Sequence, residues 1–126
     1  MSTLPAGEYY IGDPCYVIDD TKWMDFLDPY WDLKGNGGKF EFEGHEVCVF
    51  QTQWGDGCYP CSDGSSLGVD AGLIGAIPLA LAHGNPHASG TIVLYNSPFE
   101  CSRDDDGRMH FGDVEVMTGD EEEEGW

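Results

Sequence analysis

The stretch QWGDGCYPCSDGSSLGVDAGLIGAIP (Gln53–Pro78) decides how this chain folds. It holds six glycines, and its Gly-Asp and Asp-Gly pairs mark points where the backbone turns at little steric cost. Trp54, Tyr59, Leu67 and Val69 supply apolar cover between these turns. The pattern predicts a tightly shaped hairpin region that frames a binding site.

Two strands and a mixed segment are predicted inside and just beyond this stretch. Gly57–Cys61 and Leu67–Asp70 flank the turn Ser62–Ser66 (SDGSS), as in a β-hairpin. The apolar run Leu73–Ala82 suits a buried strand or a helix, but an internal glycine and Pro78 count against a continuous helix. We therefore expect a short strand or turn, followed by a helical turn after the proline.

Upstream, the chain begins with two short β-rich runs. Glu8–Ile11 and Cys15–Ile18 are predicted strands on either side of Gly12-Asp13-Pro14, where the proline cannot donate to a ladder. A kink is therefore expected between them.

A helix is predicted next. Asp19, Asp20 and Thr21 are possible N-caps. An apolar face follows at helical spacing, and we expect Pro29 to end or kink the helix after roughly two and a half turns. We interpret these side chains as core packing; they are Trp23, Phe26, Leu27 and Tyr30.

The remaining segments alternate apolar and polar residues, which is typical of half-buried strands. Asp-Gly in the turn Arg103–Gly107 is a strong hairpin signal. The strands predicted from this pattern are Lys39–Glu43, Glu46–Thr52, Gly90–Ser97, Pro98–Ser102 and Arg108–Met117.

With 126 residues, the chain has room for one core. We expect a single compact domain over residues 1–118 and an acidic tail over 119–126, whose neighbouring carboxylates repel one another. The predicted fold class is mainly β (α+β): a small antiparallel barrel or a sandwich-like sheet with one short N-terminal helix.

The net charge of the chain limits the kinds of partner that it is expected to bind. Asp and Glu number 24 against 5 Lys and Arg, which gives a net charge of −19. Such a field repels phosphate backbones and anionic membranes, so direct binding to nucleic acid or membrane is not expected. It suits divalent cations or a partner protein with a basic surface. Alternatively, the negative charge serves only to keep the protein soluble.

The location is expected to be the cytoplasm of a host cell. No basic segment followed by an apolar one marks a signal peptide near the N-terminus. No apolar run approaches the roughly 18 residues of a membrane span. The 5 cysteines are an odd number, which fits reduced thiols better than a disulfide framework.

Two metal sites are possible but incomplete. Cys58 and Cys61 form a C-x-x-C, the spacing at which two thiolates share Zn²⁺, but no second pair of ligands follows a known zinc pattern. Asp104 and Asp106 match the third and fifth positions of a Ca²⁺-binding EF-hand loop. Position 12 holds Asp113 in place of glutamate, and the flanks are β-rich, so a hairpin turn is favoured.

Aspartates that each lie beside or near a glycine suggest a third, oxygen-only cation site, provided the fold gathers them. They are Asp13, Asp56, Asp63 and Asp70. No catalytic motif is evident: none of the thiols and histidines forms a recognisable nucleophile pair, and the glycines lack the lysine and helix of a phosphate loop.

The segments GEYYIGDPCYVI, TQWGDGCY, SDGSSLGVDAGLIGAIP and FECSRDDDGRMHFGDVEVMTG resemble a family of small uncharacterised acidic proteins of bacteria and their phages. The likeness extends from Gly7 to Gly119 and rests on ordered glycines, aspartates and aromatics. It implies a compact, mostly β fold and a phage or mobile-element origin, and it carries over no catalytic residue.

The leading hypothesis is a non-enzymatic acidic protein that occupies a basic, nucleic-acid-handling site on a host protein by presenting carboxylates in place of phosphates. The acidic tail is a candidate docking peptide, with its tryptophan as anchor. Two alternatives remain: a cation-binding structural or virion accessory module, and a small hydrolase or nucleotide-binding protein that uses the Gly-rich central loop. The expected partner contacts are Trp54, Asp56, Tyr59, Asp63, Asp70, Glu121, Glu122, Glu123, Glu124 and Trp126.

Overall fold

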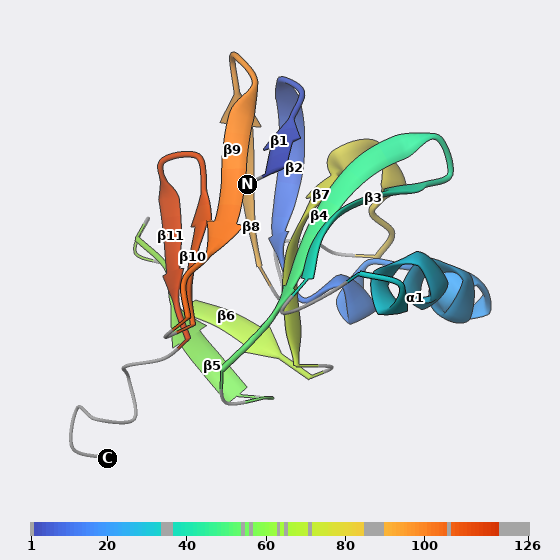
Figure 1. The fold of residues 1–126 in the computed structure, drawn as a ribbon, viewed down its shortest axis with the longest axis horizontal. Helices are drawn as coiled ribbons and strands as arrows, with labels where there is room; N and C mark the ends of the chain where they lie inside the picture. The colour runs from blue at the N-terminus through green and yellow to red at the C-terminus, as the bar shows by residue number, and fades with distance from the viewer. Residues whose placement is uncertain are drawn as a thin grey trace.

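The computed structural model describes residues 2–118 except 34–36, 54, 56, 63, 65, 71, 85–89 and 106. This part of the chain forms three antiparallel sheets and one α-helix (Figure 1). The predicted fold class, mainly β with a short helix near the N-terminus, is confirmed. The sheets are not closed into a barrel, so the barrel alternative is wrong.

The strands of the largest sheet, in spatial order, are β3 (Gly37–Phe42), β4 (His45–Gln51), β7 (Leu73–Pro78), β2 (Gly7–Gly12) and β8 (Thr91–Tyr95). The strands of a four-stranded sheet are β1 (Ser2–Leu4), β9 (Phe99–Arg103), β10 (Arg108–Phe111) and β11 (Val114–Met117). The third sheet is the hairpin of β5 (Gly57–Pro60) and β6 (Ser66–Val69).

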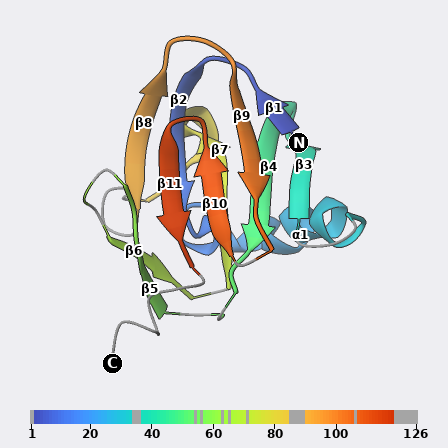
Figure 2. The same cartoon turned by 60° about the vertical axis from the view of Figure 1, so that its left-hand side comes forward.

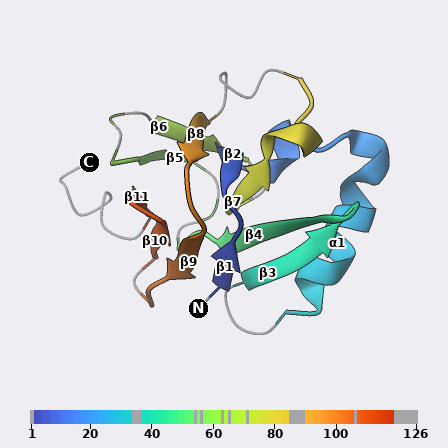
Figure 3. The ribbon, with the colours of Figure 1, turned by 90° about the horizontal axis from the view of Figure 1, so that it is seen from above.

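The elements are arranged in three layers. The four-stranded sheet faces one side of the five-stranded sheet, and α1 (Trp23–Trp31) covers the other side (Figures 2 and 3). The β5-β6 hairpin lies at the lower end of the two sheets in Figure 2. A β-bridge between Cys61 and Val116 connects this end of the hairpin to the four-stranded sheet.

Strand alternation builds a core on each face of the five-stranded sheet. On β4, Cys48 and Phe50 face the core between the sheets, whereas Val47 and Val49 face the core under α1. The first core draws on all three sheets and includes Leu4, Tyr9, Ile11, Tyr59, Leu67, Ile74, Met109, Phe111 and Val116. The second includes Tyr10, Val17, Phe26, Leu27, Tyr30, Phe40, Phe42 and Ile77.

The predicted strand Cys15–Ile18 is wrong. After β2 the chain forms a 3₁₀ helix, η1 (Pro14–Tyr16). Asp13 Oδ1 caps this helix by accepting a hydrogen bond from the Cys15 N–H at 2.9 Å. Pro14, at the first helical position, has a fixed φ that suits a helical turn. Cap and proline together outweigh the β propensity of the residues that follow.

The predicted helix is confirmed. The nine residues of α1 make about two and a half turns, and Phe26, Leu27 and Tyr30 are buried as expected. Pro29 lies inside the last turn and does not end the helix before it. Of the candidate caps, Asp19 caps a 3₁₀ helix, η2 (Asp20–Lys22), which leads directly into α1.

The predicted hairpins are confirmed with shifted ends. β3 pairs with β4 through a turn in which Glu43 and Gly44 have φ of 53° and 82°, as in the primed turns that suit twisted strands. The ambiguous run after Gly72 forms β7 and then a 3₁₀ helix, η3 (Leu79–Leu81). The single return strand predicted at Arg108–Met117 is wrong: Gly112, with a φ of 65°, divides it into β10 and β11.

Candidate functional site

A groove bordered by aromatic side chains lies between α1 and the ends of β4 and β7. We call it the aromatic groove. Its volume is about 400 Å³, at the lower end of the range for small-ligand sites. One wall is formed by Trp23, Leu27, Tyr30 and Trp31 of α1. The other is formed by Gln51, Gly55, Gly72 and Leu73.

The helix wall presents indole rings that buried neighbours hold in place. Trp31 is 65% exposed, and its ring meets the buried ring of Tyr30 edge-on, with centroids 5.2 Å apart. Trp23 is stacked on Phe26, which is fully buried, at a centroid distance of 5.6 Å. Each indole therefore has one contact with a buried aromatic ring, and Trp31 keeps most of its surface open to solvent.

The opposite wall is a tightly bonded turn. The Thr52 hydroxyl donates to the Gly55 carbonyl oxygen at 2.7 Å and accepts from the Gly55 N–H at 2.8 Å. The Tyr59 hydroxyl donates to the same carbonyl at 2.9 Å. The Thr52 N–H donates to the carbonyl oxygen of Gly72 at 2.9 Å, which joins the two glycines of the wall.

Arg103 ties this wall to the four-stranded sheet. Its Nε donates to the Gln51 carbonyl oxygen at 2.6 Å, and Nη2 donates to Gln53 Oε1 at 2.9 Å. Its Nη1 donates to the carbonyl oxygen of Asp104 at 2.9 Å. Burial raises the pKa of the Tyr30 hydroxyl, and the charge of Arg103 opposes this shift. Tyr30 therefore remains protonated at neutral pH.

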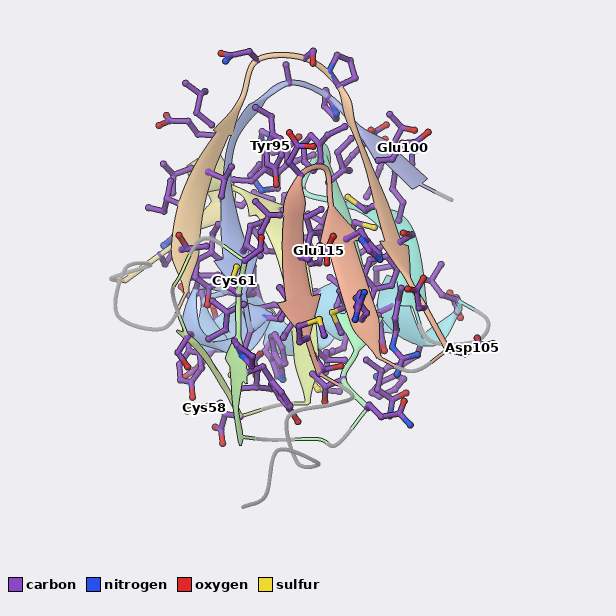
Figure 4. All side chains as sticks on the ribbon, turned by 90° about the vertical axis from the view of Figure 1, so that its left-hand side faces the viewer. Cys58, Cys61, Tyr95, Glu100, Asp105 and Glu115 are labelled. Carbon is purple, nitrogen blue, oxygen red and sulfur yellow. The ribbon has the colours of Figure 1, made fainter. Side chains whose placement is uncertain are left out.

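An acidic hollow lies on the outer face of the four-stranded sheet. Phe99 and Cys101 point into the core, so the residues between and after them on β9 point outward. The hollow has a volume of about 480 Å³ and is lined by Glu100, Ser102, Asp104, His110, Gly112 and Asp113. Figure 4 looks onto this face, on which Glu100 and Glu115 are labelled.

His110 lies between two carboxylates on this face. Its Nε2 is 3.3 Å from Asp104 Oδ2, and its Nδ1 is 3.8 Å from Glu115 Oε2. Ser102 is the register partner of His110 on β9, so a serine, a histidine and an aspartate lie close together. Both ring nitrogens are directed at carboxylates, however, and neither is directed at the Ser102 hydroxyl. The three residues are thus not arranged as an activated nucleophile.

The two thiols of the C-x-x-C lie in different surroundings. Cys58 is exposed on β5, whereas Cys61 is 6% exposed and belongs to the core between the sheets (Figure 4). Among the residues that the structure describes, no group of three or more His, Cys, Asp or Glu side chains is placed to hold a metal ion. Elsewhere in the same core, a hydrogen bond with Cys48 and burial raise the pKa of the Cys101 thiol.

The loop that partly matches an EF-hand is the turn between β9 and β10. The Asp104 N–H donates to the Arg108 carbonyl oxygen at 2.8 Å, and the Gly107 N–H donates to the Asp104 carbonyl oxygen at 3.0 Å. These bonds close the hairpin that the sequence favours over a calcium loop. Asp106 lies outside the described residues, so Ca²⁺ binding here stays a prediction, as does Zn²⁺ binding at Cys58.

Of the predicted oxygen-only site, the structure brings two members together, and it does so through the backbone. Asp13 is fully buried, and its Oδ2 accepts a hydrogen bond from the Asp70 N–H at 2.7 Å. The Tyr10 hydroxyl donates to the Asp13 carbonyl oxygen at 2.9 Å. Asp13 therefore joins η1 to the loop before β7. Asp56 and Asp63 lie outside the described residues.

The predicted partner contacts have varied positions. Asp70 is exposed, as expected of a contact residue. Tyr59 is 2% exposed and packs in the core, because its ring fills the space between the β5-β6 hairpin and the sheets. The others lie outside the described residues: Trp54, Asp56, Asp63, Glu121, Glu122, Glu123, Glu124 and Trp126.

Two features of the site did not emerge from the sequence alone. Trp31 lies one helical turn after Leu27 and eight residues after Trp23, a spacing that marks a second edge of the apolar face. The hollow is encoded by the alternation in FECSRD and MHF, in which every second residue is polar. Each pattern predicts which face of a single helix or strand is apolar or polar. Only the three-dimensional fold shows which residues lie opposite that face.

No protein-family model, no curated protein and no solved structure matches this chain. The resemblance to acidic proteins of bacteria and phages therefore stays an expectation. Among the described residues, no helix is both long and apolar enough to cross a membrane.

Proposed function

We propose that this protein is a non-enzymatic acidic binding protein that occupies a basic site on another protein. One observation carries the proposal: the carboxylates are displayed at the surface. Among the described acidic residues, only Asp13 is buried. The others are exposed or half-buried and are free of the buried ion-pair networks that would give them a structural role.

The basic residues that the structure describes do not neutralise the negative charge at the surface. Lys22 Nζ is 2.7 Å from Glu43 Oε2, and Lys39 Nζ donates to the Thr3 carbonyl oxygen at 3.2 Å. Arg103 donates to three acceptors within the fold. The Nε of Arg108 is buried. A partner therefore meets mainly carboxylates.

The described carboxylates gather in two places that suit a basic partner. Glu100, Asp104 and Asp113 line the acidic hollow, which is open enough to admit a lysine or arginine side chain. Asp25 and Asp28 lie exposed on α1, and further acids flank the helix. Carboxylates spread over a rigid surface can replace phosphates in a nucleic-acid-binding groove, and such complexes form fast and weaken steeply with salt.

A nucleic-acid-handling protein is therefore the proposed partner. A host protein of this kind also fits the phage or mobile-element origin that the sequence resemblance implies. The acidic tail, residues 119–126, is proposed to add to the attraction through its own carboxylates.

The experiment is affinity capture with the full chain at about 50 mM and about 200 mM salt, a range over which phosphate-type contacts lose much of their affinity. A captured nucleic-acid-binding protein should be released by the higher salt and displaced by added duplex DNA or RNA. Salt-independent capture, or capture that nucleic acid leaves intact, contradicts the proposal.

A pair of matched variants locates the surface. The hollow variant combines Glu100→Gln, Asp104→Asn and Asp113→Asn. The control variant removes the same charge from exposed positions elsewhere, with Glu8→Gln, Asp20→Asn and Glu41→Gln. The hollow variant is expected to weaken binding about tenfold more than the control, because its carboxylates converge on one side chain of the partner. Equal effects of the two variants would assign binding to the overall charge and not to the hollow.

A further inference from the structure

We propose that the aromatic groove receives an arginine side chain of the basic partner. This inference rests on the proposed function and names a second point of contact, separate from the acidic hollow. The groove lies between α1 and the ends of β4 and β7, whereas the hollow lies on the outer face of the four-stranded sheet.

The chemistry of the helix wall favours a planar cation. Trp23 and Trp31 line the groove, and indole rings attract a cation more strongly than other aromatic rings do. A guanidinium group stacks on such rings and is more weakly hydrated than an ammonium group, so it loses less on leaving water. Trp23 is stacked on the buried ring of Phe26, and Trp31 has an edge contact with the ring of Tyr30, so both indoles are in contact with core residues before binding.

The electrostatics around the groove also favour a cation. Tyr30 and Trp31 form the C-terminal end of α1, where the helix carries partial negative charge. All residues of the last turn of α1 are described, and none of them is basic. Asp28 lies one turn before Trp31, and Asp32 follows it directly, both with exposed side chains. The end of the helix is thus strongly negative and lacks a cation of its own within that turn.

Polar groups in the groove can receive the guanidinium donors. The Gln51 side chain offers an amide oxygen from the opposite wall, and the Tyr30 hydroxyl, kept protonated by burial, also accepts. Arg103 lies behind this wall, with its Nε bonded to the Gln51 carbonyl oxygen and its other donors directed at Gln53 and Asp104. The charge of Arg103 also acts on Tyr30 and opposes a cation in the groove, but the two exposed carboxylates of Asp28 and Asp32 at the helix end outnumber it.

An anionic occupant is disfavoured by the net charge of −19 and by the two aspartates beside Trp31. A neutral apolar occupant would fill the groove without using the negative helix end. The charge complementarity therefore points to arginine. Binding of an anionic or a neutral ligand is an alternative outcome of the test.

The test uses hexaarginine as the probe, with hexalysine and the neutral hexacitrulline as comparisons, in titrations of the full chain followed by tryptophan fluorescence. Trp31→Leu keeps an apolar side chain at an exposed position and removes the indole face. It is expected to weaken hexaarginine binding about fivefold, the effect of one partly exposed cation–π contact. The matched control is Leu94→Ala on β8, which is 61% exposed and lies outside the groove.

A second pair tests the charge. Asp28→Asn, beside Trp31, is expected to weaken hexaarginine binding more than Asp25→Asn, which lies on the far side of the helix by its spacing from the groove residues. Trp31→Leu should also reduce the preference for hexaarginine over hexalysine, a readout that a general loss of stability would not change.

The outcomes separate this inference from the proposed function. If hexaarginine binds in a salt-dependent manner but Trp31→Leu behaves like Leu94→Ala, the groove inference is overturned and the proposed function stands. If hexacitrulline binds as tightly as hexaarginine, the groove takes a neutral ligand, and the inference is again overturned. If no cationic peptide binds any form of the protein, the proposed function and the inference both fall.

Discussion

At the scale of single residues, Asp13 has the greatest structural consequence. Its side chain is fully buried, and each carboxylate oxygen accepts a backbone N–H from a different segment: Cys15 in η1 and Asp70 before β7. A buried carboxylate is costly unless such donors satisfy it. Asp13 therefore fixes how the N-terminal strand and the central stretch meet, and with them one end of the core under α1.

Replacement of Asp13 by alanine is expected to destabilise the protein by about 2–4 kcal/mol, because it leaves two N–H groups without these acceptors. Asp13→Asn, which keeps one acceptor oxygen, should cost less. Asp70→Asn is the matched control: it removes a carboxylate at the neighbouring position but keeps the backbone N–H that Asp70 donates to Asp13. Urea unfolding measures all three. A control as unstable as Asp13→Ala would contradict this account.

At the scale of elements, glycine determines how closely β4 and β7 approach. A Cβ atom built on Gly75 would lie 2.7 Å from the Cys48 carbonyl oxygen and 2.9 Å from Val49 Cγ2. The first of these is backbone in the centre of the sheet, which cannot move without breaking ladder hydrogen bonds. Gly75 is thus required by packing, a reason that differs from the turn role of most glycines nearby.

Gly75→Ala is therefore expected to destabilise the protein by about 1–3 kcal/mol, the usual cost of overpacking. Gly68→Ala on β6 is the control, because a Cβ atom there has nothing within 4 Å and the backbone has no positive φ. It should change the free energy of unfolding by less than about 0.5 kcal/mol. Thermal and urea unfolding provide the measurement, and equal losses in the two variants would show that the β4-β7 contact is not the cause.

Elements whose signals are local were predictable. The helix at Trp23–Trp31 and the hairpins β3-β4 and β5-β6 follow from spacing and turn residues. The error at η1 arose because Asp13 and Pro14 impose a helical turn on residues of high β propensity. The pairing of β1 with β9, nearly a hundred residues apart in the sequence, has no local signal.

The candidate site was predictable only in part, for the same reason. The central stretch does supply Gly55, Gly72 and Leu73 to the aromatic groove, and its role in framing a binding site stays a prediction. The groove itself requires α1 to lie against β4 and β7, a contact between distant segments. Tyr59 was predicted to contact a partner, but aromatic residues between turns occur in cores as well as at interfaces. Its position in the core depends on the arrangement of the sheets, which the sequence does not reveal.

At the scale of the whole molecule, the net charge of −19 acts on the stability of the fold as well as on its partners. Exposed carboxylates repel one another more in the compact state than in the unfolded chain, where they are farther apart. The described surface ion pairs, such as those of Lys22 with Glu43 and Lys39 with Glu46, act in the opposite direction but are exposed and weak.

Salt is therefore expected to stabilise this protein at pH 7. When NaCl is raised from about 0.01 M to about 0.15 M, the Debye length falls from about 30 Å to about 8 Å, which screens the repulsion between exposed carboxylates. The free energy of unfolding in urea should rise by an amount on the order of 1 kcal/mol. Near the pI of about 4.1, where the net charge approaches zero, the same change in salt should have little effect. A decrease in stability with salt at pH 7 would mean that the stabilising ion pairs outweigh the repulsion between carboxylates. The carboxylates would then be paired with the protein's own lysines and arginines, and fewer of them would be accessible to a basic partner.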